Sequence, residues 1–168
     1  MENKIIIVSG LPGSGKSYFA RALAQRLGAS YINSDIIRNE EGARGKYSIS
    51  DKVRIYKIMA ERASENISAG KSVVVDGTFY MNAMVRLFMT LSTTLSIPIH
   101  FILVVADEDL VRQRLSRPRQ DSEADFNVYL KIKERLEPLQ IPHLTIQSGE
   151  DNIDQMLATA IDYLQKMK

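Results

Sequence analysis

The sequence predicts an α/β protein built on a doubly wound, five-stranded parallel sheet. Short apolar runs alternate along the chain with segments whose apolar residues recur at helical spacing, and this alternation is typical of a parallel sheet. A glycine-rich turn joins the first apolar run to the first helical segment. No repeat, low-complexity tract or linker divides the chain, so we expect residues 1–168 to form a single domain.

The expected strands are short and rich in β-branched residues. Ile5-Ile6-Ile7-Val8 has no helical period and predicts a buried parallel strand, and Val73-Val74-Val75 predicts the buried centre of another. In chain order, the expected strands cover residues 5–8, 30–33, 72–76, 98–105 and 143–146. The polar, glycine-containing residues 39–48 are expected to form a loop.

The expected helices follow these strands. Phe19, Leu23 and Leu27 recur at spacing four and predict the first helix, and Gly70 is expected to end the second. In chain order, the expected helices begin near residues 15, 50, 82, 107, 123 and 153, and the fourth is interrupted at Pro118. The last is the most clearly amphipathic, because its apolar residues from 153 to 164 share one face.

Residues 10–17 fit the phosphate-loop pattern G-x-x-x-x-G-K-[ST] between the first strand and helix. Glycines at 10, 13 and 15 are expected to adopt positive φ and turn backbone N–H groups toward an anion, aided by the helix dipole. Lys16 would reach the β- and γ-phosphates, and the Ser17 hydroxyl would bind Mg²⁺. The residues predicted to bind ATP here are Gly10, Pro12, Gly13, Ser14, Gly15, Lys16 and Ser17. An ordinary Gly/Pro/Ser turn is the alternative, and the flanking strand and helix favour the nucleotide.

Two carboxylates follow predicted strands, where ligands bind in doubly wound sheets. Asp76 ends the third strand and is predicted to take part with Ser17 in binding Mg²⁺ and its waters; a helix-capping role is the alternative. Asp35 ends the second strand, where a carboxylate can accept the proton of an attacking hydroxyl. Arg38 lies three residues on, shares a helical face with Asp35 and is a candidate to hold phosphate. The alternative for this pair is an N-cap and a surface charge.

Four arginines cluster around Pro118, at positions 112, 114, 117 and 119. Guanidinium groups at a helix break suit a lid, over about residues 112–125, that neutralises the transferring phosphoryl group. Arg112 and Arg114 are accordingly predicted to bind the nucleotide. The alternative is a solvated helix face.

Composition excludes several classes of protein. The chain has no cysteine, which excludes disulfide scaffolds, thiolate metal sites and cysteine nucleophiles. The net charge is only +2, without the dense Lys/Arg stripe expected of a dedicated nucleic-acid binder. The apolar run before Ser9 is too short for a signal peptide, and no apolar stretch is long enough to span a membrane, so a cytoplasmic location is expected.

At these residues the chain resembles the predicted P-loop kinases, a family that includes the 5′-kinase domain of phage polynucleotide kinase and is related to zeta-toxin-like and small-molecule P-loop kinases. The resemblance runs in order through the phosphate loop, Asn33-Ser34-Asp35-Ile36-Ile37-Arg38, residues 73–78 and the arginine-rich segment. It implies a P-loop nucleotide-kinase fold, a general base at Asp35, a phosphate contact at Arg38 and assistance to transfer from Arg117.

The resemblance leaves the acceptor open. The phosphatase half of polynucleotide kinase is absent, Thr78-Phe79-Tyr80 replaces the Phe-Pro-Arg signature of adenylate kinase, and the Gly-Gly-Gly acceptor motif of shikimate kinase is missing. We therefore expect an ATP- and Mg²⁺-dependent kinase acting on a hydroxyl of a small metabolite, a nucleoside or antibiotic, or a polynucleotide 5′ end. Modest charge favours a small molecule over nucleic acid. An ATPase or switch without an acceptor is the alternative.

Overall fold

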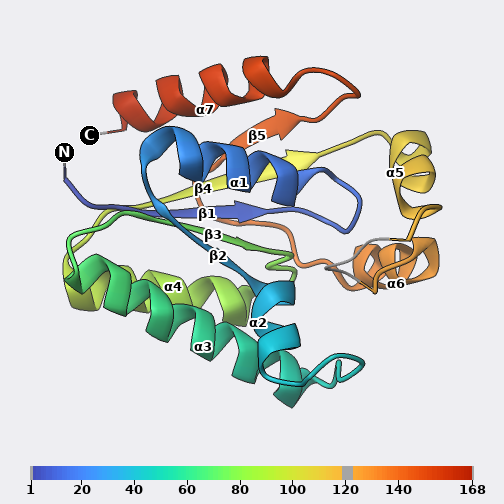
Figure 1. Ribbon diagram of the computed structural model, residues 1–168, viewed down its shortest axis with the longest axis horizontal. Helices are drawn as coiled ribbons and strands as arrows, with labels where there is room; N and C mark the ends of the chain where they lie inside the picture. Colours follow the sequence, from blue (N-terminus) through green and yellow to red (C-terminus); the bar gives the residue numbers. More distant parts are fainter. Residues whose placement is uncertain (1, 119–122, 168) are drawn as a thin grey trace.

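A computed structural model describes residues 2–118 and 123–167 of the chain, in which each strand is followed by one or two helices (Figure 1). The strands are β1 (Ile5–Ser9), β2 (Ser30–Asn33), β3 (Val73–Gly77), β4 (Ile99–Val105) and β5 (Leu144–Gln147). The helices are α1 (Lys16–Leu27), α2 (Ser34–Glu40), α3 (Ile49–Ser68), α4 (Asn82–Leu95), α5 (Glu108–Leu115), α6 (Phe126–Arg135) and α7 (Ile153–Lys166).

The five strands form one parallel sheet in the order β2-β3-β1-β4-β5, which confirms the predicted fold class. From the central strand β1 the chain first builds one side of the sheet, with β2 and β3, and then the other, with β4 and β5. The carboxyl end of β1 therefore lies at the switch point, where open α/β sheets bind ligands. In Figure 1 the arrowheads point toward α5 and α6, away from both termini.

Alternating side chains of the strands form a core on each face of the sheet. Ile5 and Ile7 belong to the cluster that includes α3 and α4, whereas Ile6 and Val8 belong to the cluster that includes α1 and α7. Figure 1 shows these two helix pairs on opposite faces. Both faces of a parallel sheet are covered in this way, which explains why the strands are continuously apolar. None of the described helices is long and apolar enough to cross a lipid bilayer.

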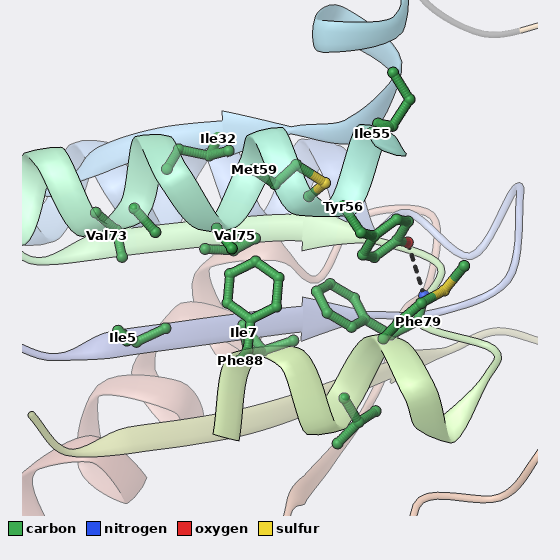
Figure 2. Packing of buried hydrophobic residues seen from close by; sticks show 14 of the residues in the cluster. Ile5, Ile7, Ile32, Ile55, Tyr56, Met59, Val73, Val75, Phe79 and Phe88 are labelled. Atoms are coloured by element: carbon green, nitrogen blue, oxygen red, sulfur yellow. Dashed lines mark hydrogen bonds between the residues drawn. The ribbon is translucent and has the colours of Figure 1, made fainter. Parts of the chain in front are cut away.

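The turn after β3 is held from within the core. Phe79 has a positive φ of 48° and is nearly fully buried, and its ring meets those of Tyr56 and Phe88 edge to face (Figure 2). Its backbone N–H donates to the Tyr56 hydroxyl at 3.1 Å. A left-handed residue without glycine's freedom costs about 1–3 kcal/mol, so the aromatic contacts must hold it there. This anchor places the neighbouring Thr78 and Tyr80 just beyond the carboxyl end of β3.

Several element boundaries differ from the expectation. Helix α2 was not among the expected helices, although Asp35 and Arg38 were expected to share a helical face. It forms because the Asn33 side chain accepts from the Ile36 N–H at 2.9 Å and caps its first turn. Helix α5 ends at Leu115, before Pro118, because a proline ring disrupts the preceding helical turn. Helix α6 begins three residues later than expected, where Asp125 caps it through the Val128 N–H.

Candidate nucleotide and acceptor site

The phosphate loop lies between β1 and α1, as predicted. Gly13 and Gly15 have φ values of +77° and +87°, and Gly15 is the N-cap of α1. A Cβ atom at Gly13 would lie 2.9 Å from Leu115 Cγ, so this close approach of α5 also requires glycine. The prediction of a positive φ at Gly10 is wrong. Glycine is needed there because a Cβ atom would lie 2.6 Å from the Val104 carbonyl oxygen.

A cavity of about 1010 Å³ opens beside this loop. Pro12, Gly13, Gly15, Lys16 and Ser17 line it, whereas Gly10 and Ser14 are buried and are not part of its lining. The amino end of α1 therefore faces the cavity with its unpaired N–H groups and positive dipole end, an arrangement that attracts phosphate.

The cavity extends to both sides of the phosphate loop, because the sheet order places the end of β5 on one side of β1 and the end of β2 on the other. The part lined by residues 148–153 and Met156, after β5, is a candidate nucleotide compartment. A candidate acceptor compartment is lined by Asp35 and Arg38 of α2, Tyr47, Lys52 and Tyr56, Thr78 and Tyr80, Met84, Glu123 and Ala124, and Val128, Lys131, Ile132 and Arg135.

Asp35 and Arg38 lie together in the first turns of α2. Arg38 Nη1 donates to Asp35 Oδ1 at 3.0 Å, and the guanidinium carbon lies 4.8 Å from the centre of the Tyr47 ring. Arg38 is only 7% exposed, and its Nε has no hydrogen-bond partner among the described residues. The N-cap of α2 is Asn33, so the alternative that Asp35 is the N-cap is wrong. The carboxylate of Asp35 instead lines the cavity.

Asp76 is fully buried at the carboxyl end of β3, beneath Asn33, which itself lines the cavity. Its Oδ2 accepts from the Tyr31 hydroxyl at 2.5 Å and from Asn33 Nδ2 at 2.6 Å. Burial, together with the Asp76 charge, raises the pKa of Tyr31, so this phenol stays a donor. Oδ1 of Asp76 has no hydrogen-bond partner among the described residues.

The arginines near Pro118 have different environments. Arg114 donates to the carbonyl oxygens of Gly13 and Gly149 at 3.2 and 2.8 Å and to Ser148 Oγ at 3.0 Å. Arg112 is outside the cavity: its guanidinium carbon lies 4.0 Å from the centre of the Phe126 ring. Arg117 is exposed and lines the cavity. Position 119 and the rest of 119–122, inside the predicted lid, lie outside the described residues.

Three cations of the acceptor compartment were not predicted from the sequence. Lys131 and Arg135 come from α6 and Lys52 from α3. The available signal was the spacing of residues 128, 131, 132 and 135, which places them on one helix face. Glu123 was not predicted either; it accepts from Arg44 Nε, the Gly45 N–H and the Tyr47 hydroxyl.

Comparisons with solved structures agree on the fold. The chain superposes on the Mycobacterium tuberculosis APS kinase, solved with AMPPNP and APS, with a TM-score of 0.77 at 18% identity, covering 98% of each chain. A Janibacter sugar kinase gives 0.75 at 19% identity over 97% of this chain and 95% of that one. Kti12 of Chaetomium thermophilum, solved with ADP-AlF3, gives 0.70 at 17% identity over 94% and 97%.

Sequence relatives are uncharacterised proteins. A UPF0200 protein of Pyrobaculum aerophilum is 30% identical over 132 residues, which are 75% of this chain and 73% of that protein. An uncharacterised protein of Mycobacterium tuberculosis is 33% identical over 88 residues, or 45% of this chain, but the match spans only 18% of its length. The narrower resemblance to the polynucleotide kinase group stays a prediction. The model of the family described as an AAA domain matches residues 5–139, and the chain therefore belongs to that family, with a P-loop kinase-like fold.

Proposed function

We propose that this protein is an ATP- and Mg²⁺-dependent kinase that transfers the γ-phosphoryl group of ATP to a hydroxyl group of a small molecule. One observation carries the proposal. The carboxylate of Asp35 lines the same cavity as Lys16 and Ser17, on the opposite side of the phosphate loop from the turn after β5. A nucleotide and an acceptor thus have separate places on either side of the loop.

The position of the phosphate loop orients the nucleotide. With the triphosphate on the amino end of α1 and the base in the nucleotide compartment, the γ-phosphate points toward α2. Lys16, only 9% exposed, then neutralises the β- and γ-phosphates. Arg38 has an unused Nε donor for a phosphate oxygen, and Arg117 would stabilise the charge that develops during transfer.

The residues present fit Mg²⁺ held jointly with ATP. Among the described residues, no group of three or more carboxylates and histidines would hold an ion by itself. Mg²⁺ commonly binds through substrate phosphates, waters and one or two protein groups. Ser17 supplies a hydroxyl at the amino end of α1, beside the cavity. The orphan Oδ1 of Asp76 is a candidate to orient a water of this ion. When bound, the ion neutralises phosphate charge.

Transfer then needs few protein groups. The acceptor oxygen attacks the γ-phosphorus, the bond from that phosphorus to the β–γ bridging oxygen breaks, and ADP leaves. The hydroxyl proton passes to the carboxylate of Asp35, which Arg38 orients at 3.0 Å.

Asp35→Asn tests this proposal because it keeps the side-chain shape but removes the base. The variant and the parent are incubated with γ-labelled ATP and a pool of metabolites, nucleosides and 5′-hydroxyl oligonucleotides. We expect normal ATP binding, a melting temperature within a few degrees of the parent, and transfer slower by at least roughly a hundredfold. Glu40→Gln is the matched control, because it removes a carboxylate of the same helix that pairs with Arg62 outside the cavity.

Two outcomes contradict the proposal. Retention of most of the transfer rate by Asp35→Asn removes the general base. ATP hydrolysis that no hydroxyl compound diverts into labelled product, and that Asp35→Asn does not change, identifies an ATPase or switch. Lys16→Ala should abolish either activity while leaving the fold intact.

A further inference from the structure

The acceptor compartment carries more positive charge than its own carboxylates neutralise. We propose that the acceptor is a small anionic alcohol, a hydroxyl compound that also carries a phosphate or carboxylate group, and that Lys52, Lys131 and Arg135 bind this anion. The inference rests on the proposed function, since it names the class of acceptor for the same site.

Two of the cations share one face of α6. Lys131 and Arg135 are four residues apart and line the cavity together with Val128 and Ile132. Among the described residues, no carboxylate lies within 4 Å of either charged group. Other cations around the cavity, such as Arg38, do have a carboxylate partner. Both residues are exposed and bring charges without a described carboxylate partner to the compartment.

Lys133 of the same helix behaves differently. Its Nζ lies 2.9 Å from Glu108 Oε2 of α5, and 5.7 Å from the centre of the Tyr129 ring. The face of α6 that packs on α5 therefore has its cation paired, whereas the cations of the face toward the cavity have no carboxylate partner in the described part of the chain. This difference within one helix argues that a ligand supplies the missing negative charge.

The third cation faces the cavity from α3. Lys52 Nζ donates to the Tyr80 hydroxyl at 2.8 Å and lies 4.9 Å from the centre of that ring. Tyr80 is only 5% exposed and is fixed by the turn after β3, so it holds the flexible lysine in place. No described carboxylate pairs with Lys52 either.

The two carboxylates of the compartment are already partnered. Asp35 pairs with Arg38 at 3.0 Å, and Glu123 pairs with Arg44 at 3.0 Å. Lys52, Lys131 and Arg135 remain as excess charge in a concave site, where charges of one sign raise the local concentration of an oppositely charged ligand.

The remaining lining limits the ligand to a small organic molecule. Met84, Val128 and Ile132 provide apolar contact for a carbon skeleton, which an inorganic anion lacks. The whole cavity of about 1010 Å³ must also hold the nucleotide, and pockets for single small ligands commonly take about 300–1,000 Å³. Lysine binds phosphate and carboxylate alike as a point charge, so the shared chemistry is the anion.

Binding is measured without turnover, in the complex with Mg²⁺ and a non-hydrolysable ATP analogue. The probes are matched pairs: glycerol and glycerol 3-phosphate, ribose and ribose 5-phosphate, glucose and gluconate, and adenosine and its 5′-monophosphate. We expect an anionic member to raise the melting temperature at concentrations where its neutral partner does not. The phosphate and carboxylate pairs distinguish the two sources of the anion.

The variant Lys131→Gln/Arg135→Gln should weaken binding of that anionic probe by about tenfold or more, because two charge-assisted contacts are lost. Lys133→Gln removes a charge from the other face of α6 and should leave binding within about twofold of the parent. A melting curve without the probe reports whether either variant is folded.

The outcomes separate this inference from the proposed function. Stabilisation by neutral and anionic partners alike, no stabilisation by any anionic probe, or equal binding by the double variant overturns the anionic acceptor. Anion binding at Lys131 and Arg135 without labelled product from any acceptor leaves the anion site standing and contradicts the kinase. Transfer to neutral alcohols alone supports the kinase and contradicts the anionic acceptor.

Discussion

Arg114 links two segments that line the cavity, the phosphate loop and the turn after β5. Its sequence position predicts a nucleotide contact, and its donors bind the phosphate loop at Gly13 and the turn after β5 at Ser148 and Gly149. It thereby joins the two segments that we expect to hold the phosphates and the base. We propose that Arg114 acts as a positioning residue.

Arg114→Gln should therefore loosen the nucleotide compartment without removing a ligand contact. We expect the free energy of unfolding to fall by about 1–3 kcal/mol and the dissociation constant of an ATP analogue to rise. Calorimetric titration and denaturant unfolding measure the two effects. Arg112→Gln is the control, because that side chain is exposed on Phe126 and its loss should change stability by less than about 0.5 kcal/mol. Equal effects of the two variants would contradict the positioning role.

At the scale of elements, residues 41–48 are joined to the start of the α6 segment through one carboxylate. Glu123 accepts from Arg44 Nε at 3.0 Å, from the Gly45 N–H at 2.9 Å and from the Tyr47 hydroxyl. The Tyr47 hydrogen bond, followed by the Arg44 and Gly45 bonds, lowers the pKa of Glu123, and burial together with Glu123 raises the pKa of Tyr47 to about 12. The contact therefore requires Glu123 ionised and Tyr47 protonated.

The contact of Glu123 with Arg44, Gly45 and Tyr47 should be lost at acidic pH. Because the folded pKa of Glu123 lies below its ordinary value of 4.5, the contact is present above that value and is lost as pH falls through the folded pKa. We expect protection of the Gly45 amide from hydrogen exchange to persist at pH 5 and to disappear at lower pH, as followed by NMR.

Glu123→Gln should expose the same segment at neutral pH. We expect faster tryptic cleavage after Arg44 and Lys46 than in the parent, because the charge-assisted contacts are weakened. Glu134→Gln, an exposed carboxylate of α6, is the control and should leave the cleavage rate unchanged. Unchanged cleavage in Glu123→Gln would show that the segment is held by other contacts.

At the scale of the whole molecule, a single domain requires that the hydrophobic cores on the two faces of the sheet unfold together. Phe88 is fully buried in the cluster beneath α3 and α4, and Phe19 in the cluster beneath α1 and α7. One sheet separates the clusters and contributes side chains to both. Neither core can keep its apolar side chains buried if the sheet unfolds, so we propose that residues 1–168 unfold as one unit.

Phe88→Ala and Phe19→Ala test this coupling. Each should lower the free energy of unfolding by about 3–5 kcal/mol, because a large buried ring is removed from a packed core. Circular dichroism and tyrosine fluorescence should report one coincident transition in both variants. Two separate transitions in either variant would contradict the single-domain proposal.

Much of the fold and part of the site could be predicted because they are encoded locally. β-Branched runs predict buried strands, and glycines with a following Lys-Ser predict the phosphate loop, because both depend on neighbours in the chain. The spacing of Asp35 and Arg38 likewise predicted that the two would share a helix face, and they do. The extent of helix α2 was not predicted, although Asn33, whose side chain caps the helix, was a local signal for its start.

The sequence by itself determined the alternation of strands and helices and the chemistry of the phosphate loop, because periodicity and turn geometry act over a few residues. Only the tertiary structure decided the strand order, which places Asp35 and the turn after β5 on opposite sides of that loop. It also separated Arg114 from Arg112 and brought Lys52 to the same compartment as Lys131, 79 positions later in the chain. Such convergence depends on how the sheet and its helices pack, and no local pattern records it.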